Sequence, residues 1–161
     1  MQYVKVDDIR EVAAEKFLKK VPLTTDKLVF NTFFFKPRQF LPFHKHPATD
    51  EVFYIVEGTG EFALGNEQVT VGPTGTVYGF ADVFHGVVNS GIGDLVMISV
   101  QGPKPIESIF ADYSTVVCPV CRQEFILKAD ATEGDAAVCP RCQSRIKLSK
   151  RPGGGWVGTQ V

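Results

Sequence analysis

The stretch HKHPATDE, residues 44–51, concentrates residue types that bind transition metals. The chain has three histidines, and two of them, His44 and His46, are separated by a single residue. On a β-strand, residues i and i+2 project from the same face with Cα atoms about 6.5–7 Å apart, so both imidazoles can reach one point. Glu51 begins the next apolar stretch and can approach that point from a neighbouring strand. The alternative is that these are surface histidines beside a turn.

The third histidine, His85, lies in the sequence FADVFHGVVN, inside another predicted strand. Imidazole nitrogens together with a carboxylate suit Fe, Mn, Ni, Cu or Zn. The whole histidine complement of the chain thus falls into one ligand-like pattern. We therefore favour a site for one divalent transition metal over surface histidines.

The elements that must position these side chains are short strands. From residue 28 onward, segments such as LVFNTFFFK, EVFYIVEG and DLVMISVQG are rich in β-branched and aromatic residues, and Gly, Pro and Asn separate them. This pattern predicts an all-β fold, an antiparallel sandwich or barrel. Ahead of the strands, DDIREVAAEKFLKK, residues 7–20, has apolar residues at roughly helical spacing and predicts a short amphipathic helix.

Two segments resemble the motifs of the cupin superfamily. HKHPATDEVFYIVEG is similar to the first motif, in which a Gly, here Gly58, follows the Glu after six residues, and GTVYGFADVFHGVVN is similar to the second. Phe80 and Asp82 stand where the second motif usually has Pro and Gly. The resemblance covers about residues 28–101 and implies a small β-barrel, or jelly roll. It also implies that one metal is held by His44, His46, Glu51 and His85.

The predicted lining of the barrel is apolar. Counting along the strand from Glu51 places Phe53 and Ile55 on the same face as the carboxylate. Arg38 is the only Arg between residues 11 and 121, and few cations favour a small neutral or aromatic substrate over a sugar phosphate or dicarboxylate. The polar side chains that we consider as catalytic or substrate-binding candidates are Tyr54, Tyr78, Asp82 and Asn89.

The other face of the same strand is also apolar. It carries Val52, Tyr54 and Val56, and a strand that is apolar on both faces needs cover on both. The cupin resemblance implies that barrels pair. We therefore expect a homodimer that buries this face.

The four cysteines form two matched pairs, CPVC at 118–121 and CPRC at 139–142. Two C-x2-C pairs separated by seventeen residues are typical of a structural zinc site, in which four thiolates surround the metal. The pattern resembles a zinc ribbon, a rubredoxin-like module, with Cys118, Cys121, Cys139 and Cys142 as ligands. Iron, as in rubredoxin, is the main competitor, but Arg122 and Gln143 stand where rubredoxin-like sites usually have Gly, so we favour zinc. Two pairs exceed what a redox dithiol needs.

The composition divides the chain into three parts. We expect a barrel with its N-terminal helix over residues 1–112, a ribbon over 113–150, and a flexible Gly-rich tail over 151–161. Residues 1–112 carry ten basic and fourteen acidic side chains, and the remainder carry seven and four. Four thiolates and a Zn²⁺ would leave the ribbon only weakly positive, so we expect it to dock a protein partner rather than nucleic acid.

The net charge of the whole chain is -1, which gives no general attraction to nucleic acid or to an anionic membrane. No apolar run approaches the length of a membrane span, and the first residues have no apolar signal core. Clustered cysteines in a chain of this kind favour metal binding over disulfides. We therefore expect a cytoplasmic protein.

Two functions fit these features. The first is a mononuclear metal-dependent enzyme acting on a small molecule, with oxygenase or dioxygenase chemistry as the favoured type. The second is a non-catalytic module that senses or binds a small molecule or metal, while its ribbon docks a partner. Both use the same fold, and a fold alone does not select a function.

Overall fold

The computed structural model describes residues 1–128, 130–151 and 155–161. One short 3-10 helix, η1 (Val6–Ile9), precedes the strands. The strands of the first unit are β1 (Leu18–Thr24), β2 (Val29–Phe35), β3 (Phe40–Lys45), β4 (Asp50–Glu57), β5 (Gly60–Leu64), β6 (Glu67–Val71), β7 (Thr76–Gly79), β8 (His85–Asn89), β9 (Leu95–Gly102) and β10 (Ile109–Phe110). Those of the second are β11 (Thr115–Val117), β12 (Glu124–Ile126), β13 (Ala136–Val138), β14 (Arg145–Lys150) and β15 (Trp156–Gln160).

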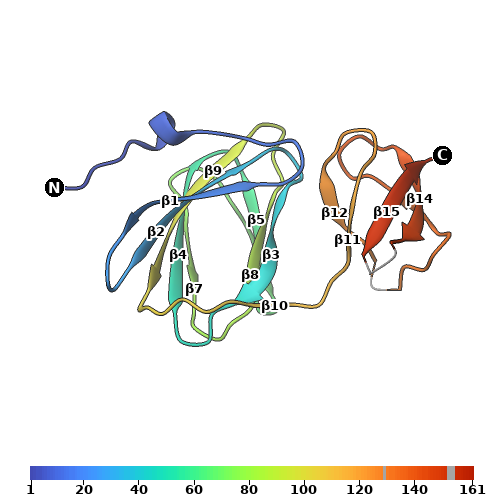
Figure 1. Cartoon of the computed structure of the whole chain (residues 1–161). Coiled ribbons are helices and arrows are strands. Elements are labelled where there is room, and N and C mark those ends of the chain that lie inside the picture. Colours follow the sequence, from blue (N-terminus) through green and yellow to red (C-terminus); the bar gives the residue numbers. More distant parts are fainter. Residues whose placement is uncertain (129, 152–154) are drawn as a thin grey trace. The chain divides into compact units, whose positions relative to one another are not determined.

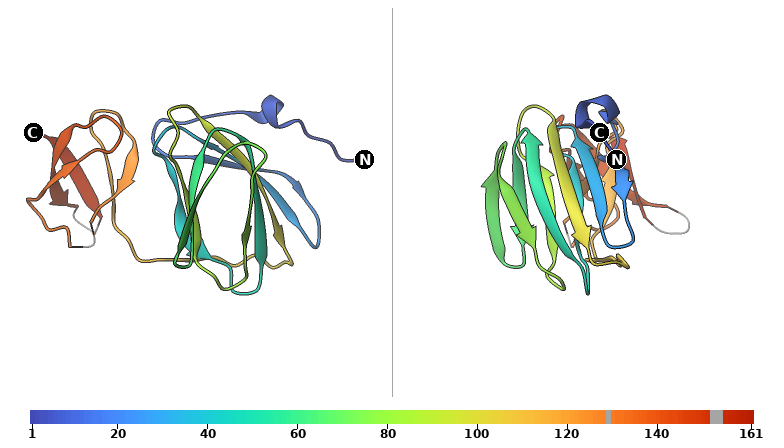
Figure 2. Two further views of the ribbon diagram at one scale, coloured as in Figure 1. Left: turned by 180° about the vertical axis from the view of Figure 1, so that it is seen from behind. Right: turned by 90° about the vertical axis from the view of Figure 1, so that its left-hand side faces the viewer.

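The chain divides into two compact units, residues 1–13 with 17–111 and residues 14–16 with 112–161. In the first unit, two five-stranded sheets have the orders β1-β2-β9-β4-β7 and β10-β3-β8-β5-β6, and all of their strand pairs are antiparallel. The two sheets face one another and enclose the interior (Figure 1), and the views in Figure 2 show the strands of each sheet lying side by side. The predicted all-β antiparallel barrel is confirmed.

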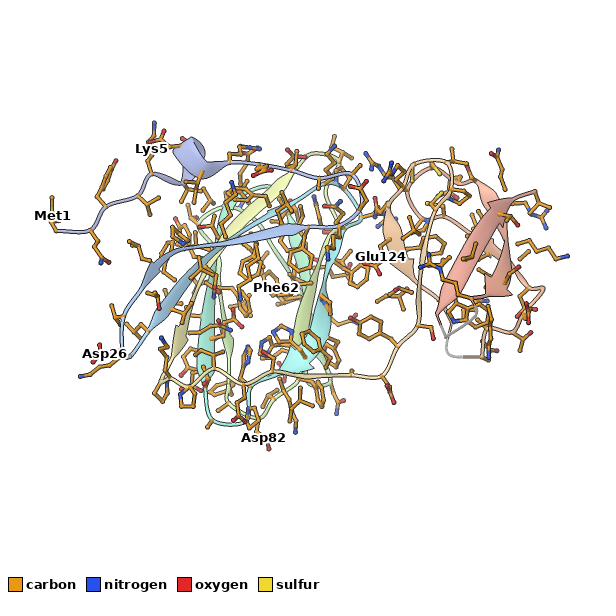
Figure 3. The ribbon with its side chains drawn as sticks, viewed as in Figure 1. Met1, Lys5, Asp26, Phe62, Asp82 and Glu124 are labelled. Carbon is orange, nitrogen blue, oxygen red and sulfur yellow. The ribbon has the colours of Figure 1, made fainter. Side chains whose placement is uncertain are left out.

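Period-two alternation sorts the barrel residues into two faces. On β9, Leu95, Met97, Ser99 and Gln101 point inward, and each stands beside an inward residue of β2 or β4. One end of the interior is a hydrophobic core, in which Phe62 lies between the sheets (Figure 3). The other core side chains are Phe33, Phe35, Leu41, Phe53, Ile55, Val77, Val87, Leu95 and Met97. The opposite end is polar and holds the histidines.

The glycine of the first motif has a clear role in the turn after β4. Gly58 has φ +84°, and a Cβ on it would lie 2.3 Å from the carbonyl oxygen of Asp94. A residue with a side chain would therefore be both strained and blocked at this position. The turn carries the chain from β4 in one sheet to β5 in the other.

The helix predicted over residues 7–20 is wrong. Only Val6–Ile9 is helical, and β1 already begins at Leu18. The helix prediction used only the spacing of apolar residues along the sequence, whereas contacts with the sheet decide how Phe17 packs. Its ring packs on those of Phe33 and Phe35, with centroids 6.1 and 5.2 Å away. Pairing with β2 supplies backbone hydrogen bonds over β1, and this tertiary contact outweighs a weak helix propensity.

The second unit contains a two-stranded sheet, β11-β12, and a three-stranded sheet, β13-β14-β15. Its core combines the cysteines with Val116, Phe125, Leu127, Ile146 and Leu148. Residues 156–160, predicted to be part of a flexible tail, instead form β15, which pairs with β14. Gly158 allows β15 to pack closely, because a Cβ at this position would lie 2.7 Å from the side chain of Ile146. Residues 152–154 of the predicted tail lie outside the described residues.

None of the helices in the part of the chain that the structure describes is long and apolar enough to cross a membrane.

Candidate metal centres

The barrel brings its three histidines and Glu51 to one point. His44 and His85 face each other in register on β3 and β8, and His46 follows directly after β3. Glu51 comes from the opposite sheet, near the start of β4. One nitrogen of each imidazole and one carboxylate oxygen all lie within 4.8 Å of one another, and all four residues are buried. This is the cluster that the two motifs predict.

Main-chain carbonyls orient each imidazole. His44 Nδ1 lies 2.6 Å from the carbonyl oxygen of Pro42, His46 Nδ1 lies 2.6 Å from that of Glu107, and His85 Nδ1 lies 2.9 Å from that of Val83. A carbonyl oxygen can only accept a hydrogen bond, so each Nδ1 carries a proton and donates it. Each Nε2 is thereby directed toward the cluster, which is the arrangement expected of histidine ligands held by their surroundings.

The carboxylate of Glu51 lies among these nitrogens. Its Oε2 is 3.2 Å from His46 Nε2, 3.3 Å from His85 Nε2 and 4.0 Å from His44 Nε2. Burial opposes ionisation, but hydrogen bonds from His46, His85 and Ser99 outweigh it and lower the pKa of Glu51 to about 2. The carboxylate is therefore ionised at neutral pH and available as a ligand.

The histidines differ in their protonation. Burial, reinforced by the charges of His85 and His46, lowers the pKa of His44 to about 4, so this ring is neutral at pH 7. Burial also disfavours the charged form of His46, but hydrogen bonds to Glu51 and to the Glu107 carbonyl prevail and raise its pKa. The surroundings therefore shift the pKa values of His44 and His46 in opposite directions.

Gln101 is a neighbour of the cluster that the sequence did not reveal. Its Nε2 lies 2.8 Å from His46 Nε2, and an amide nitrogen can only donate there. The same His46 nitrogen cannot accept from Gln101 and also donate to Glu51. If Gln101 donates, the lone pairs of His46 Nε2 and Glu51 Oε2 point at each other and repel. A metal cation bound between these two atoms removes the repulsion. The donor set thus fits a divalent metal.

Further polar side chains continue this wall along β2 and β9. Asn31 Nδ2 donates to Gln101 Oε1 at 2.8 Å and to Ser99 Oγ at 3.0 Å. Asn31 and Ser99 are completely buried, and Asn31 Oδ1 has no hydrogen-bond partner in the described structure. A buried polar atom without a partner is unusual in a core. One sequence signal could have found these residues, because Asn31 alternates with Phe33 and Phe35 on the inner face of β2.

Two further features shape the space around the histidines. A Cβ on Gly79, which stands opposite Glu51 on β7, would lie 3.2 Å from His85 Nδ1, so glycine allows the ring to approach β7. Phe110 of β10 stacks on the ring of His44 with centroids 5.5 Å apart, and Phe110 is itself 58% exposed. His44 therefore lies beneath an aromatic ring that reaches the surface.

The four other candidates from the sequence do not gather at this cluster. Tyr54 and Tyr78 lie near one another on the outer face of β4 and β7, both exposed, and a hydrogen bond with Asp50 raises the pKa of Tyr78. Asp82 lies at the lower edge of the barrel in Figure 3 and accepts from Lys45 Nζ at 2.6 Å. Asn89 is buried at the far end of β8 from His85, where its Nδ2 donates to the carbonyl of Gly93.

The cysteines of the second unit form a separate cluster. Their sulfur atoms all lie within 4.8 Å of one another, with 3.6 Å between the Sγ atoms of Cys118 and Cys142 and 3.7 Å between those of Cys121 and Cys139. Four sulfurs at about 2.3 Å from a tetrahedral zinc would be about 3.8 Å apart. The four thiols therefore fit one tetrahedral metal ion.

The two knuckles have the same backbone geometry. The N–H of Arg122 donates to the carbonyl of Cys118 at 2.9 Å, and the N–H of Gln143 donates to that of Cys139 at 3.0 Å. Arg122 and Gln143 have φ of 64° and 61°, so these positions require the left-handed conformation that glycine adopts most easily. Hydrogen bonds from the side chain and backbone of Ser144 lower the pKa of Cys142 to about 6, which favours a thiolate there.

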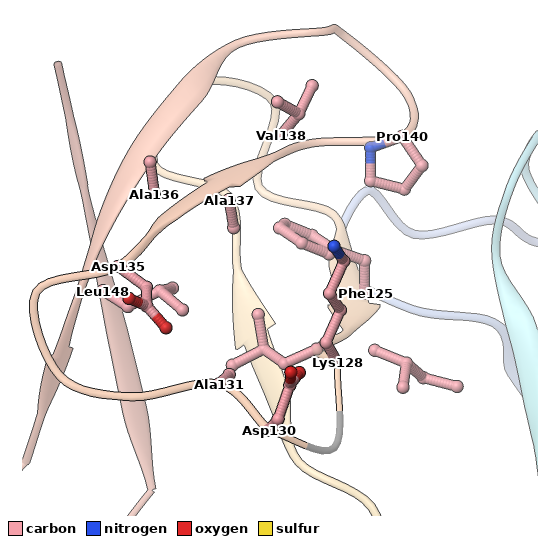
Figure 4. A pocket seen from close by; sticks show the side chains of 12 residues that line it. Phe125, Lys128, Asp130, Ala131, Asp135, Ala136, Ala137, Val138, Pro140 and Leu148 are labelled. Carbon is pink, nitrogen blue, oxygen red and sulfur yellow. The ribbon is translucent and has the colours of Figure 1, made fainter.

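A cavity of about 600 Å³ also opens in this unit (Figure 4). It lies between β12 and β13, with Phe125 and Leu148 among its apolar lining and with Lys128 and Asp130 as charged groups. The cysteines are not part of its lining. The cysteine cluster of this unit therefore lies outside the lining of the cavity.

Comparisons with known proteins agree with this architecture. Residues 31–101 match the family model described as "Cupin domain". No curated protein matches this chain significantly. The matched segment contains all four residues of the barrel cluster.

Solved structures show the same fold. TT1209 from Thermus thermophilus is 23% identical with a TM-score of 0.63, over 65% of this chain and 100% of that one. An uncharacterized conserved protein with a double-stranded beta-helix domain from Klebsiella pneumoniae is 21% identical with a TM-score of 0.66, over 70% and 98%. A predicted oxalate decarboxylase from Thermotoga maritima is 20% identical with a TM-score of 0.52, over 55% and 81%. At these identities the likeness concerns the fold alone.

Proposed function

We propose that the barrel, of which residues 31–101 match the cupin domain model, holds a mononuclear metal centre that acts on a small molecule. The observation that carries the proposal is the convergence of three imidazole nitrogens and one carboxylate oxygen within 4.8 Å. His44, His46, Glu51 and His85 would hold the metal, which would be Fe, Mn, Ni, Cu or Zn.

We propose an oxygenase type of reaction as the first candidate. Four protein ligands leave coordination positions open, and a bound transition metal supplies Lewis acidity or redox chemistry there. The chain's own contribution is orientation and exclusion of water. Carbonyls fix the three rings, Phe53 packs edge-on against His85 with centroids 5.6 Å apart, and the hydrophobic core closes the interior beyond it. The similar Thermotoga maritima structure is named as a predicted oxalate decarboxylase, and a decarboxylation needs no net oxidation.

A binding module remains the second candidate, and one observation favours it. Tyr54, Tyr78, Asp82 and Asn89, the acid-base and substrate candidates predicted from the sequence, do not face the cluster in the described structure. Gln101 and Asn31, which do border it, are amides that can orient a ligand but do not transfer protons at neutral pH. Such a site can sense a ligand or a metal without turnover.

Elemental analysis tests the metal centre. The protein is purified without a tag and without added metal, and wild type is compared with a His44→Ala/His46→Ala variant. We expect two metals per chain in wild type and loss of one in the variant. Asp82→Ala, which removes an exposed acid outside the cluster, is the matched control and should keep both metals. A metal content that the histidine variant leaves unchanged would refute the barrel centre.

Turnover assays then separate the two candidates. Metal-loaded protein is incubated with small carboxylic and aromatic compounds with and without O₂. Consumption of substrate only with O₂ supports an oxygenase, and consumption in both conditions supports an isomerase or decarboxylase. Ligand binding without turnover in either condition supports the binding module.

For the second unit, we propose that zinc, rather than iron, is held by the four cysteines and supplies much of the folding energy of this small domain. Its cavity between β12 and β13 supports a role in docking a protein partner. We also propose a homodimer through the outer face of β4 and β7, where Tyr54, Val56 and Tyr78 are exposed.

A further inference from the structure

An exposed segment lies directly against the buried histidines of the barrel. Residues 107–110, which we call the strap, follow β9 and end in β10, a strand of two residues at the edge of its sheet. The carbonyl oxygen of Glu107 accepts the hydrogen bond from His46 Nδ1 at 2.6 Å, and Ser108 Oγ lies 3.2 Å from the same nitrogen. The first half of the strap therefore contacts one proposed metal ligand directly.

The second half of the strap contacts another ligand through Phe110. Phe110 of β10 stands opposite His44 of β3, and opposite residues of an antiparallel pair share a face. The two rings stack with centroids 5.5 Å apart and an interplanar angle of 28°. His44 is 5% exposed, whereas Phe110 is 58% exposed. Because β10 is the last strand of its sheet, the ring of Phe110 covers His44 where the sheet ends.

The strap is the side of the cluster where solvent is nearest. Its three residues that contact the histidine rings are all exposed. In the described parts of the chain, the other residues that contact these rings by hydrogen bonds or ring packing are buried or half-buried; they are Pro42, Glu51, Phe53, Val83 and Gln101. A metal ion that enters through the strap therefore passes a single layer of residues.

Few contacts hold the strap in place. β10 pairs with β3 alone, through two residue pairs, and the N–H of Ala111 adds one hydrogen bond to the carbonyl of Phe43 at 2.9 Å. The side chain of Ile109 projects from the other face of β10 and is 47% exposed. Short edge segments with little buried apolar surface open at a lower free energy than core strands. The strap can therefore separate from β3 while the barrel stays folded.

We propose that the strap is the cover through which metal and ligand enter the barrel centre, and that Phe110 holds it closed. The proposal rests on the proposed metal centre and adds how that centre is reached. Opening takes the ring of Phe110 off His44 and the carbonyl of Glu107 off His46. One movement of the strap thus uncovers two ligands and releases both rings.

Metal exchange tests the proposal, with Co²⁺ as the probe. Stopped-flow absorption follows Co²⁺ entering the metal-free barrel, and a second mixing experiment follows its release to excess EDTA. The ribbon holds zinc throughout, and a His44→Ala/His46→Ala variant gives the signal that does not come from the barrel. Wild type is compared with Phe110→Ala, with Phe110→Tyr, which keeps the ring, and with Ile109→Ala.

Phe110→Ala should raise the rates of Co²⁺ entry and release together. A cover must open in both directions of exchange, so weakening it accelerates both. Loss of the stacked ring should raise each rate about tenfold, and the dissociation constant should change by less than about threefold. A faster release alone, with a matching loss of affinity, would mean that Phe110 only positions His44, and the cover would be refuted.

The control variants separate the ring from the strand that carries it. Phe110→Tyr should exchange Co²⁺ like wild type, because the ring still stacks on His44. Ile109→Ala removes an exposed apolar side chain of the same strand and should change the rates by less than about twofold. If Ile109→Ala accelerates exchange as much as Phe110→Ala does, the ring has no special role and the proposal fails.

Hydrogen exchange reports the opening itself. The amide of Ala111 should exchange faster than the amides of β8 and β9 in wild type, and faster still in Phe110→Ala. An Ala111 amide as protected as those of β9 would show that the strap opens only when the barrel unfolds, which contradicts the proposal.

The same data keep the two proposals apart. If the wild-type barrel binds Co²⁺ and Phe110→Ala exchanges it at the wild-type rates, the strap is not the entrance and the metal centre stands. If wild type gives no more Co²⁺ signal than the His44→Ala/His46→Ala variant, the proposed metal centre is overturned and this inference with it.

Discussion

Acidification should destabilise the metal-free barrel through His44, and a single variant isolates the effect. Folding lowers the pKa of His44 from 6.5 to about 4, mainly by burial and then by the charges of His85 and His46. Above pH 6.5 the ring is neutral in the folded and the unfolded chain, so it contributes no pH dependence. Between pH 6.5 and about 4 the unfolded chain binds a proton that the folded chain does not, and stability falls as the pH falls.

The magnitude follows from the shift. A change from 6.5 to about 4 corresponds to roughly 3 kcal/mol, since one pKa unit is worth about 1.36 kcal/mol. His44→Gln cannot take up this proton. Relative to this variant, the free energy of unfolding of wild type should fall by about 3 kcal/mol between pH 7 and pH 4. Glu51 loses its own contribution only as the pH falls from its ordinary value toward 2, and that loss is common to both proteins.

The assay must report on the barrel alone. Urea titrations read by hydrogen exchange of peptides from β4 and β9 follow this unit separately from the ribbon. The barrel metal is removed first, and the ribbon metal is kept equal in both proteins. With the barrel metal restored, wild type should resist acid better, because the metal binds the neutral ring.

Parallel pH profiles of wild type and His44→Gln would contradict this reasoning. Parallel profiles would mean that the His44 ring is solvated in the folded protein. Burial would then not lower its pKa. A steeper fall in His44→Gln would reverse the assigned sign.

Three further predictions concern other parts of the chain. Gly79→Ala places a Cβ 3.2 Å from His85 Nδ1 and should displace the ring, so that metal titration shows binding of the barrel metal weakened about tenfold. Gly72→Ala, the control, has open space around it and should not change metal binding. Cys118→Ser should remove the ribbon metal and expose β14 to hydrogen exchange while the barrel keeps its metal, and retention of zinc would count against a four-cysteine site. Tyr54→Asp with Tyr78→Asp should give monomers by light scattering at micromolar concentration, and a wild type that is already monomeric would exclude the proposed dimer.

The strand register explains which side chains the sequence alone could bring together. His44, His46 and Glu51 lie within eight residues, so period-two projection and one turn are enough to place them together. The clustering within each cysteine pair was predictable for the same reason, because each knuckle is a local structure. The position of His85 came from a motif, but its contact with His44 exists only because β3 pairs with β8.

The failures share a physical cause. Residues 7–20 carry an apolar spacing that suits a helix, and nothing local shows that β2 offers Phe17 and Lys19 a better partner. Gln101 and Asn31 alternate with core residues, but whether that inner face is polar at the level of His46 depends on how β9 aligns with β2 and β4. Tyr54 was a candidate because of its side chain, although alternation from Glu51 already placed it on the outer face.

The sequence by itself therefore determined the all-β class, the two groups of candidate metal ligands and their separation into two units, because each depends on composition or on short spacing. The tertiary structure alone decided what surrounds the barrel cluster. The carbonyl of Glu107 orients the ring of His46, and Gln101 meets the same ring. These contacts join residues up to 61 positions apart, and only the pairing of strands across the barrel brings such residues together.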